Sequence, residues 1–101
     1  MASAKVKKES EGPITVKIQI DRGGQIGQQS RSFTIHMDDP LRRIMLDFCD
    51  FFNLIYPLLR FTFEGLRIRE SHTARDLGIE DGDVIDVFSE ATGGYMLKIN
   101  S

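Results

Sequence analysis

The chain has 101 residues, of which 41% are hydrophobic and 28% charged, and its formal net charge is −2. This length is sufficient for one domain with a modest core and too short for two. The near balance of charge gives no reason to expect binding to nucleic acid or phospholipid, and no stretch approaches the roughly 20 consecutive apolar residues that span a bilayer. We therefore expect a soluble protein of one domain.

The amino-terminal segment, residues 1–13, is rich in small, charged and turn-forming residues, and Val6 is its only β-branched apolar residue. Such a segment cannot bury enough surface to offset the entropy of ordering it, so we predict a flexible arm. Its polarity also argues against a secretory signal. The single thiol, Cys49, cannot form an internal disulfide, which favours the reducing interior of a cell.

Two strands are predicted after this arm. Apolar and polar residues alternate from Ile14 to Ile20, the pattern of a half-buried strand. Alternation returns from Arg31 to Met37, and the polar segment Asp21–Ser30 between the two runs is rich in glycine. The pattern predicts a hairpin with a long, mobile loop.

The main helix is predicted to begin at Asp39-Pro40. A carboxylate can cap free backbone amides, and proline at the first helical position gives up only an amide that has no partner. Apolar residues then recur at helical spacing and form one stripe, which ends near Asn53: Leu41, Met45, Phe48, Cys49 and Phe52. Because Cys49 lies on this stripe, we expect a buried hydrophobic side chain rather than a catalytic thiol.

The second half of the chain predicts three further strands. Leu59–Phe63 alternates, Glu64-Gly65 marks a turn, and Leu66–Ile68 forms a short return strand. A single helical turn is expected from His72 or Thr73 to Leu77, with Gly78 at its end. After the turn at residues 81–83, Val84–Phe88 forms the last strand.

The order of elements, β-β-α-β-β-β, defines an α+β fold in which one main helix packs across one face of a mixed sheet. The second strand is expected at an open edge beside the helix, where its free backbone groups could accept an extended peptide. Neither a metal site nor a hydrolase is indicated. Asp81-Gly82-Asp83 lacks the register of a calcium loop, and no nucleophile, base and orienting group form a coherent set.

A diglycine follows the last predicted strand. Thr92-Gly93-Gly94 precedes Tyr95 and the remaining residues to Ser101. Two residues without Cβ can lie extended in a channel too narrow for side chains, and the second offers an unhindered carbonyl to a nucleophile. The chain's own carboxyl end is therefore a candidate reactive group.

At this point the chain resembles a known family, the small ubiquitin-like modifiers called SUMO, over about Ile14 to Gly94. The resemblance is carried in order and spacing by Phe61–Ile68, His72-Thr73, Asp76–Val87 and Thr92-Gly93-Gly94. It implies the ubiquitin-like β-grasp fold, with a SUMO domain over residues 14–89, a flexible diglycine tail over 90–94 and a propeptide over 95–101. It also implies a monomer with a nuclear and cytoplasmic location.

The resemblance further implies a precursor of a protein tag. A SUMO protease would cut between Gly94 and Tyr95, an activating enzyme would adenylate Gly94 and pass it on as a thioester, and a conjugating enzyme would join it to a substrate lysine by an isopeptide bond. The chain itself would be neither an enzyme nor dependent on a cofactor. The alternative is a SUMO-like interaction domain that is never conjugated.

Two binding surfaces follow from the same resemblance. A groove between the second strand and the helix would take up SUMO-interaction motifs as an added strand, using Phe33, Ile35, His36, Arg43, Ile44 and Phe48. An acidic surface would dock the conjugating enzyme, using Glu64, Gly65, His72, Asp81, Asp83 and Asp86. These apolar residues could equally be core, and the acidic turn could serve solubility alone.

The amino-terminal arm and the end of the predicted helix each have one further feature. Val6-Lys7-Lys8-Glu9 has the apolar-lysine-any-acid pattern of an acceptor site, so Lys7 is a candidate for chain formation, although a solvated charge run is the plainer interpretation. The segment Phe51–Leu58 is apolar where the family commonly carries polar residues and a glycine. This surface must either be exposed or repack.

Overall fold

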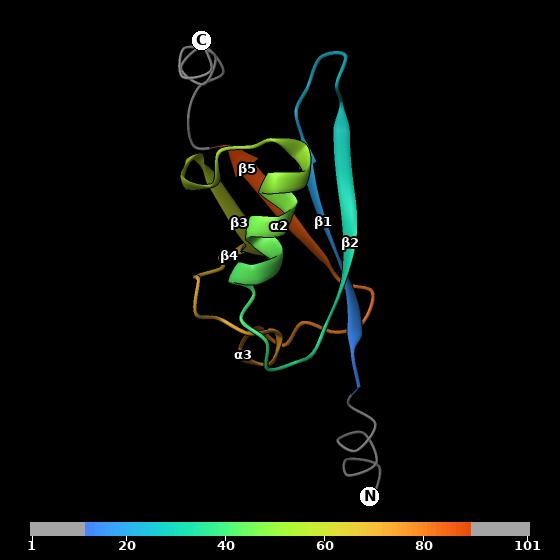
Figure 1. Ribbon diagram of the computed structural model, residues 1–101, viewed down its shortest axis with the longest axis vertical. Coiled ribbons are helices and arrows are strands. Elements are labelled where there is room, and N and C mark those ends of the chain that lie inside the picture. The colour runs from blue at the N-terminus through green and yellow to red at the C-terminus, as the bar shows by residue number, and fades with distance from the viewer. Residues whose placement is uncertain (1–11, 90–101) are drawn as a thin grey trace, which may run out of the picture.

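The computed structural model describes residues 12–89. Five strands, two helices and one short 3-10 turn follow one another in this part of the chain (Figure 1). In order they are β1 (Ile14–Asp21), β2 (Gln28–Ile35), α2 (Arg42–Phe52), η1 (Tyr56–Leu58), β3 (Leu59–Phe63), β4 (Leu66–Arg67), α3 (Ala74–Leu77) and β5 (Val84–Ser89).

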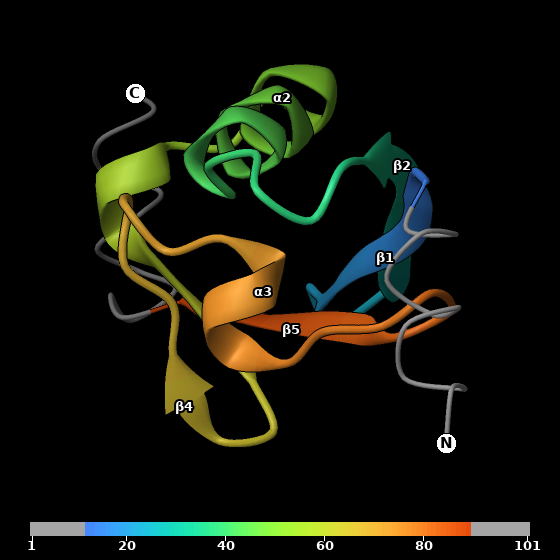
Figure 2. The ribbon, with the colours of Figure 1, turned by 90° about the horizontal axis from the view of Figure 1, so that it is seen from below.

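The strands form one mixed sheet in the order β2-β1-β5-β3-β4. β1 is antiparallel to β2 and parallel to β5, while β3 is antiparallel to both β4 and β5. Figure 1 and Figure 2 show α2 lying across one face of this sheet. The predicted α+β fold and the predicted order of elements are confirmed, and β2 occupies one edge of the sheet while β4 occupies the other.

The hydrophobic core lies between α2 and the sheet. Val16 and Ile18 of β1 and Phe48 of α2 have no exposed surface. The ring of Phe48 meets that of Phe61 on β3 edge to face, with 6.3 Å between centroids. Since burying a side chain of this size contributes about 1.5–3 kcal/mol, the apolar stripe of the helix holds α2 against the sheet.

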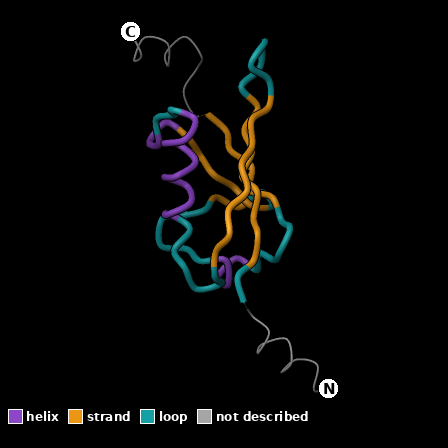
Figure 3. Tube along the Cα trace, turned by 45° about the vertical axis from the view of Figure 1, so that its right-hand side comes forward, coloured by secondary structure: helices purple, strands orange, loops and turns teal. Residues whose placement is uncertain are grey.

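The first hairpin differs from its prediction, because β2 begins and ends earlier than Arg31–Met37. The ladder with β1 extends to the pair Asp21↔Gln28, so the loop is confined to residues 22–27 and both ends of the segment predicted as loop are strand. Figure 3 shows the turn of this hairpin projecting beyond the rest of the sheet. At the other end, the Met37 carbonyl accepts a hydrogen bond from the Arg75 amide instead of continuing the ladder.

Glycines make this tight turn possible. The Arg22 amide donates to the Gly27 carbonyl at 2.9 Å, and the Gly27 amide donates to the Gly23 carbonyl at 3.0 Å. Gly23 and Gly27 have φ of 68° and 66°, a left-handed conformation that costs little only without a Cβ. The polar residues after the turn, Gln28–Ser30, can therefore pair with β1, although their sequence shows no alternation.

The predicted helix start at Asp39-Pro40 is wrong. Asp39 caps a local turn instead, because its Oδ2 accepts the His36 amide at 3.0 Å and its own amide donates to the His36 carbonyl at 3.1 Å. The N-cap of α2 is Leu41, which makes no side-chain cap. Its amide donates to the carbonyl of His72 at 2.8 Å, so a neighbouring loop supplies an acceptor at the helix start.

The second helix, α3, follows its prediction. Thr73 Oγ1 accepts the Asp76 amide at 3.1 Å and Asp76 Oδ2 accepts the Thr73 amide at 3.0 Å, a reciprocal capping box. Gly78 ends the helix at φ 72°. Arg75 donates to both carboxylate oxygens of Asp38 at 2.7 and 3.1 Å, which ties α3 to the segment that follows β2.

Candidate interaction surfaces

The edge strand β2 can accept an added strand. It pairs with β1 on one side only, so the backbone groups of its other side have no strand partner in the described sheet. Extended peptides bind such edges through main-chain hydrogen bonds, and side-chain contacts provide selectivity. The predicted edge position of the second strand beside the main helix is confirmed.

The six predicted groove residues fall into two sets. Three have exposed fractions of 5% or less and belong to the core: Ile35, Ile44 and Phe48. Phe33 is half-buried, and His36 and Arg43 are exposed. Phe33 is therefore the apolar member of the six with accessible surface, and Arg43 is an exposed cation on α2.

A residue pair that the sequence analysis missed bounds this surface. Arg31 of β2 pairs with buried Ile18 across the ladder and so lies on the face of the sheet that α2 covers. Its guanidinium carbon is 4.1 Å from the centroid of the Phe51 ring on α2 and 5.6 Å from that of Phe33. The side chain of Arg31 therefore connects the strand edge to the helix. We define Arg31, Phe33, His36, Arg43 and Phe51 as the β2–α2 surface.

The apolar segment Phe51–Leu58 is mostly repacked. Phe52, Leu54 and Tyr56 pack against the core. Phe51 alone among the aromatic residues here points outward, with 59% of its surface exposed. Asn53 ends α2 at φ 61° and turns the chain into η1, which the sequence analysis did not predict.

Three aspartates of the predicted acidic surface hold the fold together. Asp81 Oδ1 accepts the Thr15 amide at 2.7 Å, and Asp83 Oδ2 accepts the Glu80 amide at 2.8 Å. Asp86 Oδ1 accepts the side-chain amide of Gln19 at 3.0 Å, which joins β5 to β1. A carboxylate can accept up to about four hydrogen bonds, so each of these groups retains capacity for a basic partner.

The remaining residues of that surface lie in two other segments. Glu64 and Gly65 form the β3–β4 turn, with φ of 51° and 86°. The pair Thr62↔Asp86 places this turn toward the end of the sheet where β5 begins. His72 precedes α3, and its Nδ1 accepts the Arg69 amide at 2.9 Å. The structure thus groups the β3–β4 turn with the start of β5, whereas His72 is held by its own loop.

Cys49 is buried, as its position on the apolar stripe predicted. Burial raises the pKa of its thiol to about 11, so the reactive thiolate is disfavoured at neutral pH. Within residues 12–89, no group of three or more His, Cys, Asp and Glu side chains is arranged to hold a metal ion. No helix in that range is long and apolar enough to cross a membrane.

The predicted reaction centre lies outside the described residues. This applies to Thr92, Gly93, Gly94 and the bond to Tyr95, as well as to the candidate acceptor Lys7. The predicted amino-terminal arm, except Gly12 and Pro13, also lies outside them.

The fold places the chain among ubiquitin-like proteins. A ubiquitin from Caldiarchaeum subterraneum matches with a TM-score of 0.68 and 22% identity, over 82% of this chain and 100% of that one. A solution structure of an N-terminal ubiquitin-like domain matches with a TM-score of 0.62 and 18% identity, over 81% of this chain and 79% of that one. The fold is therefore the ubiquitin-like β-grasp.

Sequence comparison narrows the class to a family. The model described as ubiquitin-2 like Rad60 SUMO-like matches residues 24–88. The chain is 36% identical over 92 residues to small ubiquitin-related modifier 2 of Danio rerio, covering 91% of both chains. It is 36% identical over 89 residues to small ubiquitin-related modifier 4 of Sus scrofa, covering 88% of both. The chain belongs to the SUMO family, whose members are protein modifiers and not enzymes.

Proposed function

We propose that this chain is the precursor of a conjugated protein modifier. Proteolysis after Gly94 would free a glycine carboxylate. An activating enzyme would convert it to an acyl adenylate with ATP and release of pyrophosphate, and then to a thioester on its own thiol with release of AMP. A conjugating enzyme then carries the acyl group to a lysine amine of the substrate, with release of its own thiol. The modifier supplies the acyl group and the binding surfaces, and every catalytic residue belongs to a partner.

The position of the diglycine is the observation that carries this proposal. In a SUMO-family chain, Thr92-Gly93-Gly94 follows the last strand of the domain after a short connection. Neither glycine has a side chain that would obstruct an extended backbone in a narrow enzyme channel. Tyr95–Ser101 would then be the segment removed on maturation.

The described surfaces would serve recognition. The β2–α2 surface combines an open strand edge, accessible Phe33 and the exposed cation Arg43, which suits an extended apolar peptide with acidic neighbours. The acidic surface around Glu64, Asp83 and Asp86 would dock the conjugating enzyme without a covalent bond.

Incubation of the full chain with a SUMO protease, followed by intact mass spectrometry, tests the proposal. The expected product ends at Gly94 and has lost residues 95–101. A Gly94→Ala chain is the matched control and should be cut more slowly, because the added methyl group obstructs the channel. The trimmed chain should then form a thioester with the activating enzyme, visible as a reducible band.

The same assays separate the alternative, a SUMO-like binding domain that is never conjugated. A chain produced directly with Gly94 at its end bypasses the protease. If that chain also fails to form a thioester while an established SUMO protein does so in parallel, conjugation is ruled out. The open edge of β2 would still support the binding role.

A further inference from the structure

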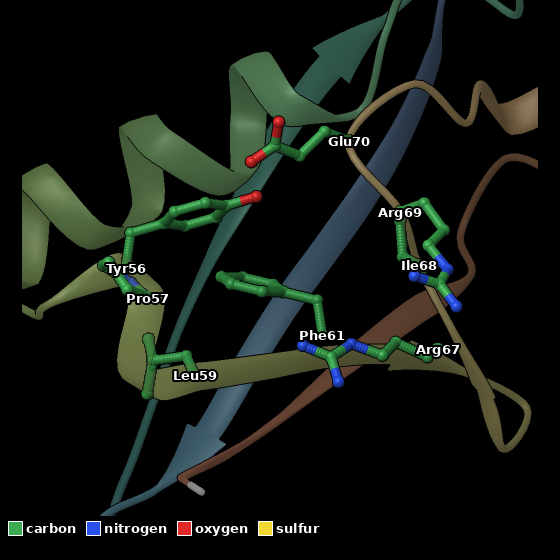
Figure 4. Close-up of a pocket in the computed structure, with 8 residues that line it drawn as sticks. All are labelled: Tyr56, Pro57, Leu59, Phe61, Arg67, Ile68, Arg69 and Glu70. Atoms are coloured by element: carbon green, nitrogen blue, oxygen red, sulfur yellow. The ribbon is translucent and has the colours of Figure 1, made fainter.

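A pocket lies near the edge of the sheet opposite to β2, and neither recognition surface includes it. It has a volume of about 400 Å³ and lies between η1, β3 and the segment after β4 (Figure 4). Its walls are formed by Tyr56, Pro57, Leu59, Phe61, Arg67, Ile68, Arg69 and Glu70. This volume is at the lower end of the range for ligand sites, about 300–1,000 Å³, and suits one or two peptide side chains.

The pocket combines an apolar floor with a charged rim. Leu59, Phe61 and Ile68 are 3–5% exposed, so the residues of the floor are held in the packed core. Arg67 and Arg69 are exposed at the rim. A rigid apolar floor with a few polar groups is the usual composition of a binding site.

The single carboxylate of the pocket is engaged within the protein. Figure 4 shows the Tyr56 hydroxyl directed at Glu70, and the two side chains are hydrogen bonded. Burial and this carboxylate raise the pKa of the Tyr56 phenol, which keeps it a donor. Arg42 Nε of α2 also lies 3.9 Å from Glu70 Oε1. The charge of Glu70 is thus partly compensated within the protein.

Guanidinium groups bind carboxylates with two hydrogen bonds in a fixed geometry. We propose that this pocket is a second peptide site, which takes up an apolar side chain of a partner protein against Tyr56 and Pro57, above the packed floor, while the adjacent acidic residue of the partner pairs with Arg69. The site is independent of the diglycine and of β2. One partner could therefore hold both sides of the sheet at once.

A titration of the full chain, followed by amide NMR, tests this site. The probe is the tetrapeptide Ac-Gly-Leu-Asp-Asp-NH₂, and its control is Ac-Gly-Leu-Asn-Asn-NH₂. The aspartate peptide should shift the amides of residues 56, 58, 59 and 67–70. The asparagine peptide should bind at least about threefold more weakly, because a neutral amide accepts weaker hydrogen bonds from a guanidinium than a carboxylate does. Sodium acetate alone should produce much smaller shifts, because it lacks the apolar anchor.

Two variants test which guanidinium group binds the carboxylate of the peptide. Arg69→Gln should weaken binding of the aspartate peptide and leave binding of the asparagine peptide unchanged. Arg22→Gln, which alters an exposed arginine of the β1–β2 turn, should change neither. Equal binding of the two peptides, equal shifts with acetate, or shifts confined to β2 and α2 would each overturn the proposal. None of these outcomes bears on the processing of Gly94, which the protease assay measures.

Discussion

At the scale of single residues, some side chains that were predicted to bind a partner also stabilise the fold. Asp81 and Asp83 were predicted as an acidic docking surface, yet both accept backbone amides in the connections around β1 and β5. Replacing either would alter the fold together with the surface charge. Glu64 is exposed and lies in the β3–β4 turn, so it is the better position for testing the charge of that surface alone.

The buried thiol gives a prediction that depends on pH. The pKa of Cys49 is raised to about 11, whereas an unfolded cysteine ionises near ~8.5. The neutral thiol therefore adds stability below the unfolded pKa, and this contribution is lost as the pH rises toward about 11. In Cys49→Ala the free energy of unfolding should fall less steeply over that range, as measured by urea denaturation at several pH values.

The same burial should protect Cys49 from reagents. At pH 8 the native chain should react with a disulfide reagent such as Ellman's at least about tenfold more slowly than the chain in guanidinium chloride. Equal rates in the two states would show that the thiol is accessible in the folded protein.

The capping box of α3 gives a second prediction at this scale. Thr73→Ala removes the acceptor of the Asp76 amide and should lower the free energy of unfolding by about 1 kcal/mol. Thr73→Ser keeps a hydroxyl and is the matched control. Urea denaturation of the three chains measures the difference, and equal midpoints for Thr73→Ala and the unchanged chain would contradict it.

At the scale of elements, periodicity located most of the fold. Alternation identified β1 and β3, and the turn at residues 81–83 marked the start of the apolar strand β5. The stripe of Met45, Phe48 and Cys49 identified the buried face of α2. Two boundaries could not be read from pattern. The start of β2 is polar and depends on a glycine turn, and the start of α2 depends on the His72 carbonyl, which is distant in sequence.

The contact between β2 and α2 could not be predicted from the sequence either. Arg31 and Phe51 meet only because the register of β1 with β2 places Arg31 on the covered face. A cation beside an exposed ring contributes about 0.5–1 kcal/mol. Arg31→Ala and Phe51→Ala, alone and combined, should show a coupling of that size in urea denaturation.

Arg60 and Phe88 provide a matched comparison for this double-mutant cycle. They form the same kind of pair, but the guanidinium carbon lies 5.8 Å from the ring centroid, so their coupling should be smaller. Strictly additive effects of Arg31→Ala and Phe51→Ala would mean that the observed stacking carries no net energy.

At the scale of the whole molecule, the order of strands separates the two proposed peptide sites. β2 and β4 lie at opposite edges of the sheet, so a strand-adding peptide and a ligand of the Tyr56–Glu70 pocket would approach different sides. The family and the fold could be predicted from the sequence, because the motifs between Phe61 and Gly94 match the family in order and spacing. The pocket could not, since η1 and the segment after β4 meet only in three dimensions.

We predict that the conjugated protein forms chains through Lys7. Lys7→Arg keeps the positive charge but removes the nucleophilic amine, so a reconstituted reaction with activating and conjugating enzymes should lose its ladder of multiple copies. Lys8→Arg is the matched control and should leave the ladder intact. A ladder that persists in Lys7→Arg would assign chain growth to a different lysine.

The composition of the exposed β2 edge affects how copies behave when a chain of modifiers crowds them together. Unpaired strand edges invite identical strands to associate and can seed fibrils. An antiparallel match centred on Arg31 would set two guanidinium groups against each other, and like charges directly opposite in a ladder are destabilising. The residues of β2 other than Phe33 and Ile35 are polar, so pairing of two copies of β2 would bury little apolar surface. The edge can thus pair with the strand of a partner protein, whereas pairing with β2 of a second copy is disfavoured.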